Sequence, residues 1–358
     1  MKEAARKAGG KREYRFHRLF MLNLLKTLAG DIAMKQTLIA LAVLGLSGAA
    51  MAQQSSVTLY GLADAGVGRI NPTAQDGLLA SLGIGGAGPD SNNKTQFISG
   101  SRMNNGDSRI GVRGIEDLGG GMRAGYNFES GLNLNDGSNT TSPDFWARQA
   151  NVWLSGNWGG VKLGRQYTAG YLSTAAYELT DTANYSVLGN TYNYAEGIRS
   201  NSAFGYSLPT FNGLTLGGGY ASKNDIGINA WDLIAVYANG PFVAGGSLTK
   251  TSNGKNGYTL GGKYNFSNFV LAASCAQYVL PGTHMVRRGF ELGGTAKFGA
   301  FAVTLDLTSD AKNDLGAKKY TNGLLELKYT LSKRTFLYAA YLRLDSTNNY
   351  SLGINHSF

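Results

Sequence analysis

The sequence predicts an all-β protein whose strands close into a 16-stranded antiparallel barrel that spans a membrane. Three observations predict it. Segments of about ten residues, in which apolar and polar side chains alternate, recur along the chain. The connections between them are short and long in turn. The last segment, Tyr350–Phe358, places Leu352 and Ile354 on an apolar face and ends on an aromatic residue.

The first 52 residues are predicted to be a leader that precedes the fold. Residues 1–33 are basic and irregular, and the simplest interpretation is a misassigned start with translation beginning at Met34. Residues 34–52 combine a charged start, an apolar run and a small-residue cleavage pattern, which predicts a signal peptide cleaved after Ala52. A long charged region of the signal peptide and a short buried helix are the alternatives. The barrel is predicted over residues 53–358.

Charge and composition narrow the class of protein. Residues 1–52 hold nine of the 33 basic and three of the 23 acidic residues, so their removal lowers the net charge from +10 to +4. The high charge therefore gives no reason to expect nucleic-acid binding. The 51 glycines, 20 tyrosines and 15 phenylalanines favour many curved strands. Cys275 is the single cysteine, which excludes an intramolecular disulfide, and we interpret it as a small buried or lipid-facing residue.

The first five strands are predicted where alternation is clear. They are Val57–Ile70, Ser108–Leu118, Met122–Leu134, Trp146–Gly156 and Gly159–Thr168. Residues 71–100 are rich in Gly, Asn and Ser, which predicts a long loop without regular structure. Residues 135–144 form a second long connection. A third, residues 169–197, is another long internal segment without clear alternation.

Eleven further strands follow this third connection. They are Ser200–Leu208, Leu214–Ser222, Ala230–Asn239, Phe242–Thr251, Gly257–Phe266, Phe269–Leu280, Arg288–Phe298, Phe301–Ser309, Thr321–Leu331, Thr335–Asp345 and Tyr350–Phe358. An even number of strands joined by alternating short turns and long loops is typical of outer-membrane barrels. Ten residues tilted at about 45° span the hydrocarbon layer. A barrel of this size keeps an aqueous lumen.

Aromatic residues near the predicted turns indicate a girdle at the two membrane interfaces. They are Tyr60, Phe128, Tyr206, Tyr220, Tyr237, Tyr264, Phe266, Phe298, Phe301, Tyr329, Phe336 and Phe358. Ordinary packing at strand ends is the alternative reading.

Four stretches then resemble one known family. They are SSVTLYGLADAG at 55–66, SRIGVRGIEDLGGGMRAGYNFESGLNL at 108–134, RQANVWLSGNWGGVKLGRQY at 148–167 and the final NHSF. They are similar to the general porins of beta-proteobacteria, the group with the Neisseria, Bordetella and Burkholderia porins, and the resemblance covers residues 55–358. It implies a homotrimeric 16-stranded barrel with a long third loop folded into the lumen. It places the protein in the outer membrane of a Gram-negative bacterium, in contact with lipid and lipopolysaccharide.

Candidate pore residues follow from the direction of the side chains. Arg109 and Arg113 share a face opposite Ile110 and Val112, so they are expected to point into the lumen. Arg199 lies opposite the face of the apolar residues in its strand and is expected to point inward too. The direction of Arg148 is open, because Ala150, Val152 and Leu154 share its face. The resemblance implies that Arg109, Arg148 and Arg199 belong to an arginine ladder at the pore constriction.

Carboxylates in the third loop complete the expected constriction. Glu178, Asp181 and Glu196 are expected to face the arginines across the narrowest point. Arg113, Arg123 and Arg165 are further candidates for the arginine row at the constriction. The arginines outnumber these carboxylates, which predicts a weak preference for anions. Tyr177, Tyr185, Tyr192 and Tyr194 are expected to pack the loop against the wall.

The leading function is passive diffusion of ions and small hydrophilic solutes. A solute-specific channel remains open because tyrosines occur in residues 169–197, and so does a structural or adhesin barrel. An enzyme is disfavoured, since His284 and His356 have no Ser or Asp partner by spacing and no metal-ligand cluster stands out. No cofactor is expected.

Overall fold

The computed structural model describes residues 55–358, except 83–87, 89, 140–143, 196, 223–228, 253 and 317. The predicted leader, residues 1–33 and 34–52, lies outside the described residues, and so does Glu196.

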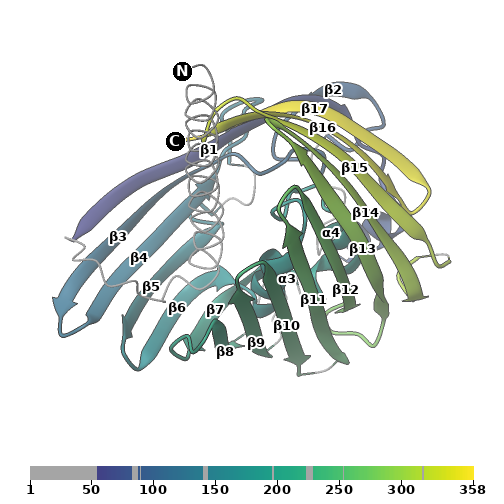
Figure 1. Cartoon of the computed structure of the whole chain (residues 1–358). Coiled ribbons are helices and arrows are strands. Elements are labelled where there is room, and N and C mark those ends of the chain that lie inside the picture. The colour runs from purple at the N-terminus through teal and green to yellow at the C-terminus, as the bar shows by residue number, and fades with distance from the viewer. Residues whose placement is uncertain are drawn as a thin grey trace, which may run out of the picture. The chain divides into compact units, whose positions relative to one another are not determined.

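Sixteen long strands in the described residues pair antiparallel with their neighbours and close into a barrel (Figure 1). Their bounds are β1 Ser56–Arg69, β3 Arg109–Gly119, β4 Met122–Gly131, β5 Gln149–Gly156, β6 Gly159–Tyr167, β7 Arg199–Ser207, β8 Leu214–Ala221, β9 Ala230–Asn239, β10 Phe242–Thr251, β11 Asn256–Phe266, β12 Phe269–Val279, β13 Val286–Phe298, β14 Phe301–Asn313, β15 Thr321–Thr330, β16 Thr335–Leu344 and β17 Thr347–Ser357. β1 closes the sheet by pairing with β3 over Ser56–Leu62 and with β17 over Leu62–Arg69. The predicted 16-stranded antiparallel barrel is confirmed.

The two faces of each strand differ as the alternation predicted. In β17, Leu352 and Ile354 lie on the outer face and are 65% and 46% exposed. Asn349 and Asn355 point inward and are almost fully buried. Polar side chains therefore fill the inner face, and apolar side chains cover the outer face.

Two-residue turns at one end of the barrel contrast with longer connections at the other. Gly240-Pro241 joins β9 to β10, and Gly299-Ala300 joins β13 to β14. Both glycines have positive φ, +56° and +61°, which a two-residue hairpin favours and which glycine adopts without strain. The connections at the opposite end contain the helices and most of the candidate site.

Residues 71–100 are not the irregular loop that was predicted. They contain α2 (Ala74–Ser81) and the short strand β2 (Thr95–Ile98), which pairs with Gly66–Arg69 of β1. α2 begins with a capping box, because Thr73 and Asp76 hydrogen-bond each other's backbone N–H. The spacing of Thr73 and Asp76 was a local signal for the start of this helix. It was overlooked because the segment as a whole is rich in Gly, Asn and Ser.

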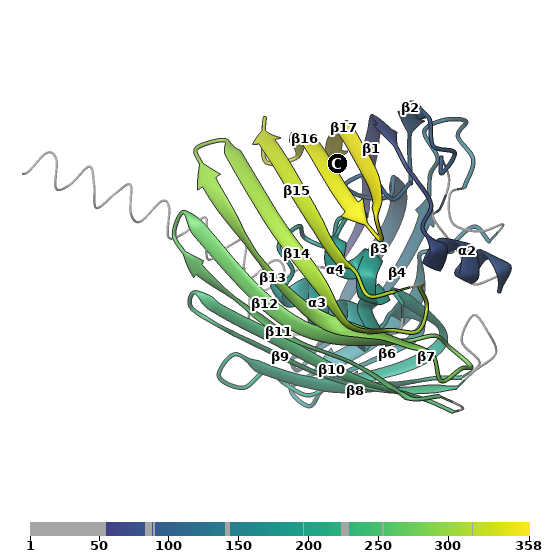
Figure 2. The ribbon, with the colours of Figure 1, turned by 90° about the vertical axis from the view of Figure 1, so that its right-hand side faces the viewer.

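The connection between β6 and β7 contains α3 (Ala169–Tyr177), α4 (Val187–Tyr192) and a short 3-10 turn, η1 (Asn193–Ala195). α3 packs on β9, β10 and β11, while α4 packs on β12 to β16. Figure 2 shows both helices within the curve of the sheet. None of the helices in the described residues has the length and apolar character needed to cross a bilayer.

Tyrosines hold this connection against the inner wall, as expected. Tyr177 and Tyr185 are fully buried, and Tyr192 is nearly so. The ring of Tyr177 lies on Gly261, where an added Cβ would be only 2.6 Å from a ring carbon. Glycine on the wall thus allows the ring to lie close to the sheet, which fixes the path of the connection.

Ten of the twelve aromatic residues predicted for the girdle lie on the outer face, and two do not. Phe301 and Tyr329 pair across strands on the outer face, with ring centroids 4.5 Å apart. Tyr60 instead points inward, where its hydroxyl donates to Glu129 at 3.0 Å. Phe336 also faces inward and packs against the buried cluster around Tyr338. Both residues occupy positions of their strands that alternate with the outward-facing ones, so their side chains point inward. Proximity to a turn does not reveal this.

Candidate functional site

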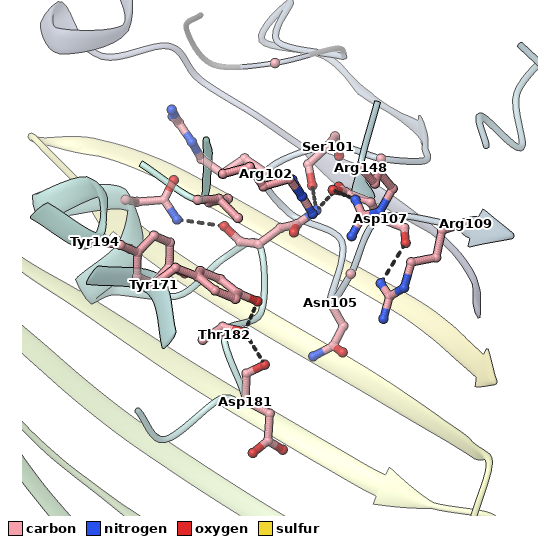
Figure 3. Close-up of a pocket in the computed structure, with 18 of the residues that line it drawn as sticks. Ser101, Arg102, Asn105, Asp107, Arg109, Arg148, Tyr171, Asp181, Thr182 and Tyr194 are labelled. Carbon is pink, nitrogen blue, oxygen red and sulfur yellow. Dashed lines mark hydrogen bonds and ion pairs between the residues drawn. The ribbon is translucent and has the colours of Figure 1, made fainter. Parts of the chain in front are cut away.

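A cavity of about 510 Å³ lies between the connection after β1 and the connection between β6 and β7 (Figure 3). Its charged lining residues in the described part of the chain are Arg102, Asp107, Arg109, Arg148, Asp181 and Arg199. Three of the predicted arginines therefore meet at one cavity, although they come from distant parts of the sequence.

Arg109 is the first residue of β3 and points inward, as its parity predicted. Its Nη1 donates to the carbonyl oxygen of Asp107 at 3.1 Å. Its Nε lies 3.6 Å from Oε2 of Glu129 on the adjacent strand. The side chain remains 27% exposed, so its charge is accessible from the cavity.

Arg148 also points into the barrel, which settles the direction that the sequence left open. β5 begins at Gln149, so Arg148 lies outside the strand and does not follow its alternation. Its Nε donates to Oε1 of Glu129 at 2.8 Å, and its Nη1 donates to Oδ2 of Asp107 at 2.5 Å. Its charge is thus bound to two carboxylates.

Arg199 is the first residue of β7, and its guanidinium lies over the ring of Tyr167 at 5.1 Å from the centroid. It forms no ion pair with a carboxylate among the described residues. Stacking on an aromatic face orients the guanidinium without neutralising it. Arg199 therefore presents positive charge to the cavity.

Arg113 and the two additional arginines occupy other places. Arg113 lies over the ring of Tyr60 at 5.2 Å and is exposed, four residues along β3 from Arg109. It points inward but does not line the cavity. Arg165 donates to Asn201 and to the carbonyl oxygen of Ala147. Arg123 lies on the inner face of β4 opposite Asp117, near the two-residue turn.

The expectation for Glu178 is wrong. Glu178 is fully buried, and its carboxylate accepts hydrogen bonds from the backbone of Thr180 and Thr182 at 2.8 and 2.7 Å. Burial raises the pKa of Glu178, although these donors act in the opposite direction. The side chain folds back onto its own connection and cannot face the arginines.

Asp181 lines the cavity, but it does not pair with the arginines. Its backbone has φ of +60°, and the residue is exposed. Figure 3 shows its carboxylate directed away from Asp107 and Arg109. The carboxylates that meet the arginines come from elsewhere.

Those carboxylates, Asp107 and Glu129, were missed by the sequence reasoning. Burial would raise the pKa of Asp107, but Arg148 and the amide of Asn184, which donates at 2.7 Å, hold the pKa below its usual value. Glu129 lies on the inner face of β4, next to Gly111 of β3. The alternation of β4 was a signal for Glu129, whereas Asp107 precedes its strand and gave none. Arg102, also missed, is bound to Asp76 of α2.

The tip of the connection between β6 and β7 is fastened both to the segment that precedes β3 and to β15. Asn184 Nδ2 donates to Asp107, and Asn105 Nδ2 donates to the Tyr185 hydroxyl at 2.7 Å. The same hydroxyl donates to Glu326 of β15 at 2.6 Å. The cavity is therefore bounded by a segment held at both sides. Such a boundary can restrict the passage of solutes and impose a field on ions.

Comparison with known proteins places the chain among channel proteins. A sequence profile described as Gram-negative porin matches residues 37–349. Outer membrane porin protein 32 of Delftia acidovorans is 32% identical, over 90% of this chain and 92% of that protein. An outer membrane porin protein of Bordetella pertussis is 28% identical, over 91% of this chain and all of that protein.

Solved structures share the same fold. The anion-selective porin from Comamonas acidovorans superimposes with a TM-score of 0.66 at 26% identity, covering 85% of this chain and 100% of that chain. OmpT of Vibrio cholerae, in a trimer form, gives a TM-score of 0.59 at 13% identity, covering 86% of this chain and 100% of that chain.

Proposed function

The chain belongs to the family of Gram-negative porins, and we propose that its arginine-lined cavity is the constriction that gives this channel a weak anion preference. The protein is an outer-membrane barrel and a passive channel for ions and small hydrophilic solutes. The proposed constriction comprises Arg109, Arg148 and Arg199 on one side. The connection containing Asp181 lies on the other.

The observation that carries this proposal concerns the four arginines that line the cavity in the described residues: carboxylates neutralise two of them much more fully than the other two. Arg102 is bound to Asp76, and Arg148 is bound to Asp107 and Glu129. Arg109 lies 3.6 Å from a carboxylate that Arg148 already binds more closely, and Arg199 is stacked on Tyr167. Two arginines thus contribute positive potential where solute passes, which raises the local concentration of anions. The solved relative described as anion-selective agrees with this direction.

Arg113 adds positive charge to the lumen wall further along β3, toward the end of the barrel with the two-residue turns. Its stacking on Tyr60 leaves it exposed on the inner face of β3. An ion that passes Arg109 and Arg199 would next meet Arg113, so the positive potential would continue along the wall.

A solute-specific channel is the second candidate, because one side of the cavity is aromatic. Tyr167 and Tyr171 stack at 4.7 Å, and Tyr171 meets Tyr194 edge-on at 5.1 Å. All three line the cavity. Aromatic faces of this kind can hold a planar or sugar-like solute. Saturable block of the ionic current by one neutral solute, lost in Tyr171→Ala, would favour this candidate.

A homotrimer is the assembly that the outer surface supports. On the outer face of β1 and β3, Ala63, Ala65 and Gly114 form a small-residue face bordered by the larger residues Leu59 and Val67, whereas leucines cover β10 to β14. Beside this small-residue face, Phe145 and Trp146 are 65% and 38% exposed and pack edge to face. Such a surface suits contact with a partner subunit better than contact with lipid. Native mass spectrometry of Phe145→Asp should show monomers where the unchanged protein shows trimers.

The constriction is tested by the reversal potential of the purified protein in a planar bilayer under a KCl gradient. The unchanged protein should show a small shift toward the chloride equilibrium potential, and the Arg109→Gln/Arg199→Gln variant should lose it. Lys333→Gln/Arg334→Gln is the matched control, since both residues lie in the connection between β15 and β16, away from the cavity. An equal shift in both variants would contradict the proposal.

A further inference from the structure

The inner wall of the barrel carries a group of hydrogen-bond donors that the constriction does not use. β3, β4, β5 and β6 lie side by side (Figure 1), and their inner faces carry Arg113, Asn127, Trp153 and Lys162. Arg113 pairs in register with Asn127, and Trp153 pairs with Lys162 two residues further toward the two-residue turns. We call these four residues the donor group.

The indole of Trp153 lies over a glycine of the neighbouring strand. Trp153 pairs with Gly125 of β4, and a Cβ added at Gly125 would be 2.5 Å from Cε2 of the indole. Because glycine has no side chain, the ring extends from β5 across β4, in the direction of β3. The indole is partly exposed, and its Nε1–H has no hydrogen-bond partner among the described residues. Trp153 therefore presents a planar apolar ring and a donor to the lumen.

Arg113 and Asn127 present further donors beside this ring. The Arg113 guanidinium lies 5.2 Å from the centroid of the Tyr60 ring, is exposed, and has no ion-pair partner in the part of the chain that the structure describes. The Tyr60 hydroxyl donates to Oδ1 of Asn127 at 3.2 Å. This contact occupies the amide oxygen of Asn127, while its Nδ2 donates to none of the described residues. The two side chains thus offer N–H groups without acceptors.

Carboxylates of the wall do not neutralise the donor group. Among the described residues, the inner faces of β3 to β6 carry two carboxylates, Asp117 and Glu129. Glu129 binds Arg148, and Oδ1 of Asp117 accepts a hydrogen bond from the backbone N–H of Gly119 at 2.8 Å. Lys162 is partly exposed and has no hydrogen-bond or ion-pair partner in the described chain. A solute bound here would therefore have to supply the acceptors.

The spacing within the donor group fits a short planar anion. Asn127 and Gly125, the residue under the indole, are two residues apart on β4, which corresponds to about 7 Å. A benzoate ion is of similar length, so its carboxylate can contact Arg113 and Asn127 while its ring lies on Trp153. An inorganic anion would leave the indole unused, and a neutral aromatic solute would leave the cations unused.

We propose that the donor group binds aromatic carboxylates in the lumen. Arg113 offers a planar fork of donors that matches a carboxylate, Trp153 stacks on the ring, and Lys162 beside it adds a positive charge. The site lies four residues along β3 from Arg109, on the side of the two-residue turns, so it is separate from the constriction. It goes beyond anion preference, because it requires an aromatic ring as well as a negative charge, and it rests on the channel function only in that solutes enter the lumen.

Binding is measured by the fluorine NMR relaxation of para-fluorobenzoate, titrated onto the full protein in detergent micelles. Benzoate should displace this probe at a concentration about tenfold lower than cyclohexanecarboxylate or benzamide does. Arg113→Gln should bind the probe about tenfold more weakly, since it loses charge-assisted hydrogen bonds. Trp153→Leu should bind it about fivefold more weakly, and Trp153→Phe should retain most of the binding because a ring remains. Trp158→Leu is the matched control, since Trp158 lies in the turn between β5 and β6 and stacks on Tyr206.

Four results would overturn the site. Equal displacement by cyclohexanecarboxylate would mean that the ring is not recognised, and equal displacement by benzamide would mean that the charge is not. Unweakened binding in Arg113→Gln and Trp153→Leu, or equal weakening in the control variant, would place the probe elsewhere. Trp153→Leu alters no charge, so its reversal potential under a KCl gradient should match that of the unchanged protein. Failure of the aromatic carboxylate site is thereby distinguished from failure of the constriction, because probe binding is measured without ionic current.

Discussion

Arg148 Nη1 lies 2.5 Å from Oδ2 of Asp107, and neither residue belongs to a strand. Asp107 precedes β3, and Arg148 precedes β5. The pair joins two connections at the point where the barrel wall meets the cavity. Glu129 binds the same guanidinium from β4. Three segments of the chain therefore depend on one buried arginine.

Replacing Arg148 should affect both stability and selectivity. In Arg148→Gln, Asp107 and Glu129 lose their shared partner, and breaking a buried ion pair on one side costs about 3–5 kcal/mol. The two unpaired carboxylates should also reduce the anion preference. The free energy of unfolding in lipid vesicles and the reversal potential would measure the two effects. Unchanged values of both would show that neither the stability nor the selectivity depends on Arg148.

Asp107 should make stability depend on pH in acid. Its pKa in the folded protein is below the usual value of about 3.9. Its stabilising contribution should therefore be fully present above about pH 4 and be lost as pH falls through the folded pKa. The free energy of unfolding should differ between the unchanged protein and Asp107→Asn at pH 7, and the difference should shrink below about pH 4. A difference that grows in acid would contradict this account.

The alternation of strands predicts only residues inside strands. Arg109, Arg113 and the face of β17 were predicted correctly because each lies within a strand whose neighbours show its parity. Arg148 could not be predicted, since the pattern does not reveal that β5 starts one residue later. Glu178 and Asp107 depend on the path of connections, which is set by long-range contacts such as Tyr185 with Glu326. Tyr60 and Phe336 were misassigned because position near a turn was given more weight than parity.

The Tyr185 hydroxyl should keep the connection between β6 and β7 in place. Tyr185→Phe removes the hydrogen bond to Glu326 and the one from Asn105, each worth about 1 kcal/mol and more where Glu326 is charged. The single-channel current should then fluctuate more, because the tip of the connection is less restrained. Tyr341→Phe is the control, since its hydroxyl donates to Asn348 at an exposed place. Equal current noise in both variants would refute this role.

Gly261 should be required for the Tyr177 ring to pack against β11. A Cβ there would lie 2.6 Å from both the Tyr177 ring and Ser274 Cβ, and overpacking of this kind costs about 1–3 kcal/mol. Gly261→Ala should therefore lower the thermal unfolding midpoint. Gly246→Ala is the matched control on the adjacent strand, because its added Cβ would make ordinary contacts at 3.4 and 3.5 Å. A control variant that loses as much stability would mean that α3 does not depend on this contact.

The central claim is that uncompensated arginines at the cavity select anions, and the most direct test is the reversal potential of Arg199→Glu under a KCl gradient. Arg199 lines the cavity without a carboxylate partner in the described residues, so reversing its charge changes the potential without breaking an ion pair. The account predicts a shift toward the chloride equilibrium potential in the unchanged protein and a shift toward the potassium value in the variant. The same reversal potential in both proteins would contradict it.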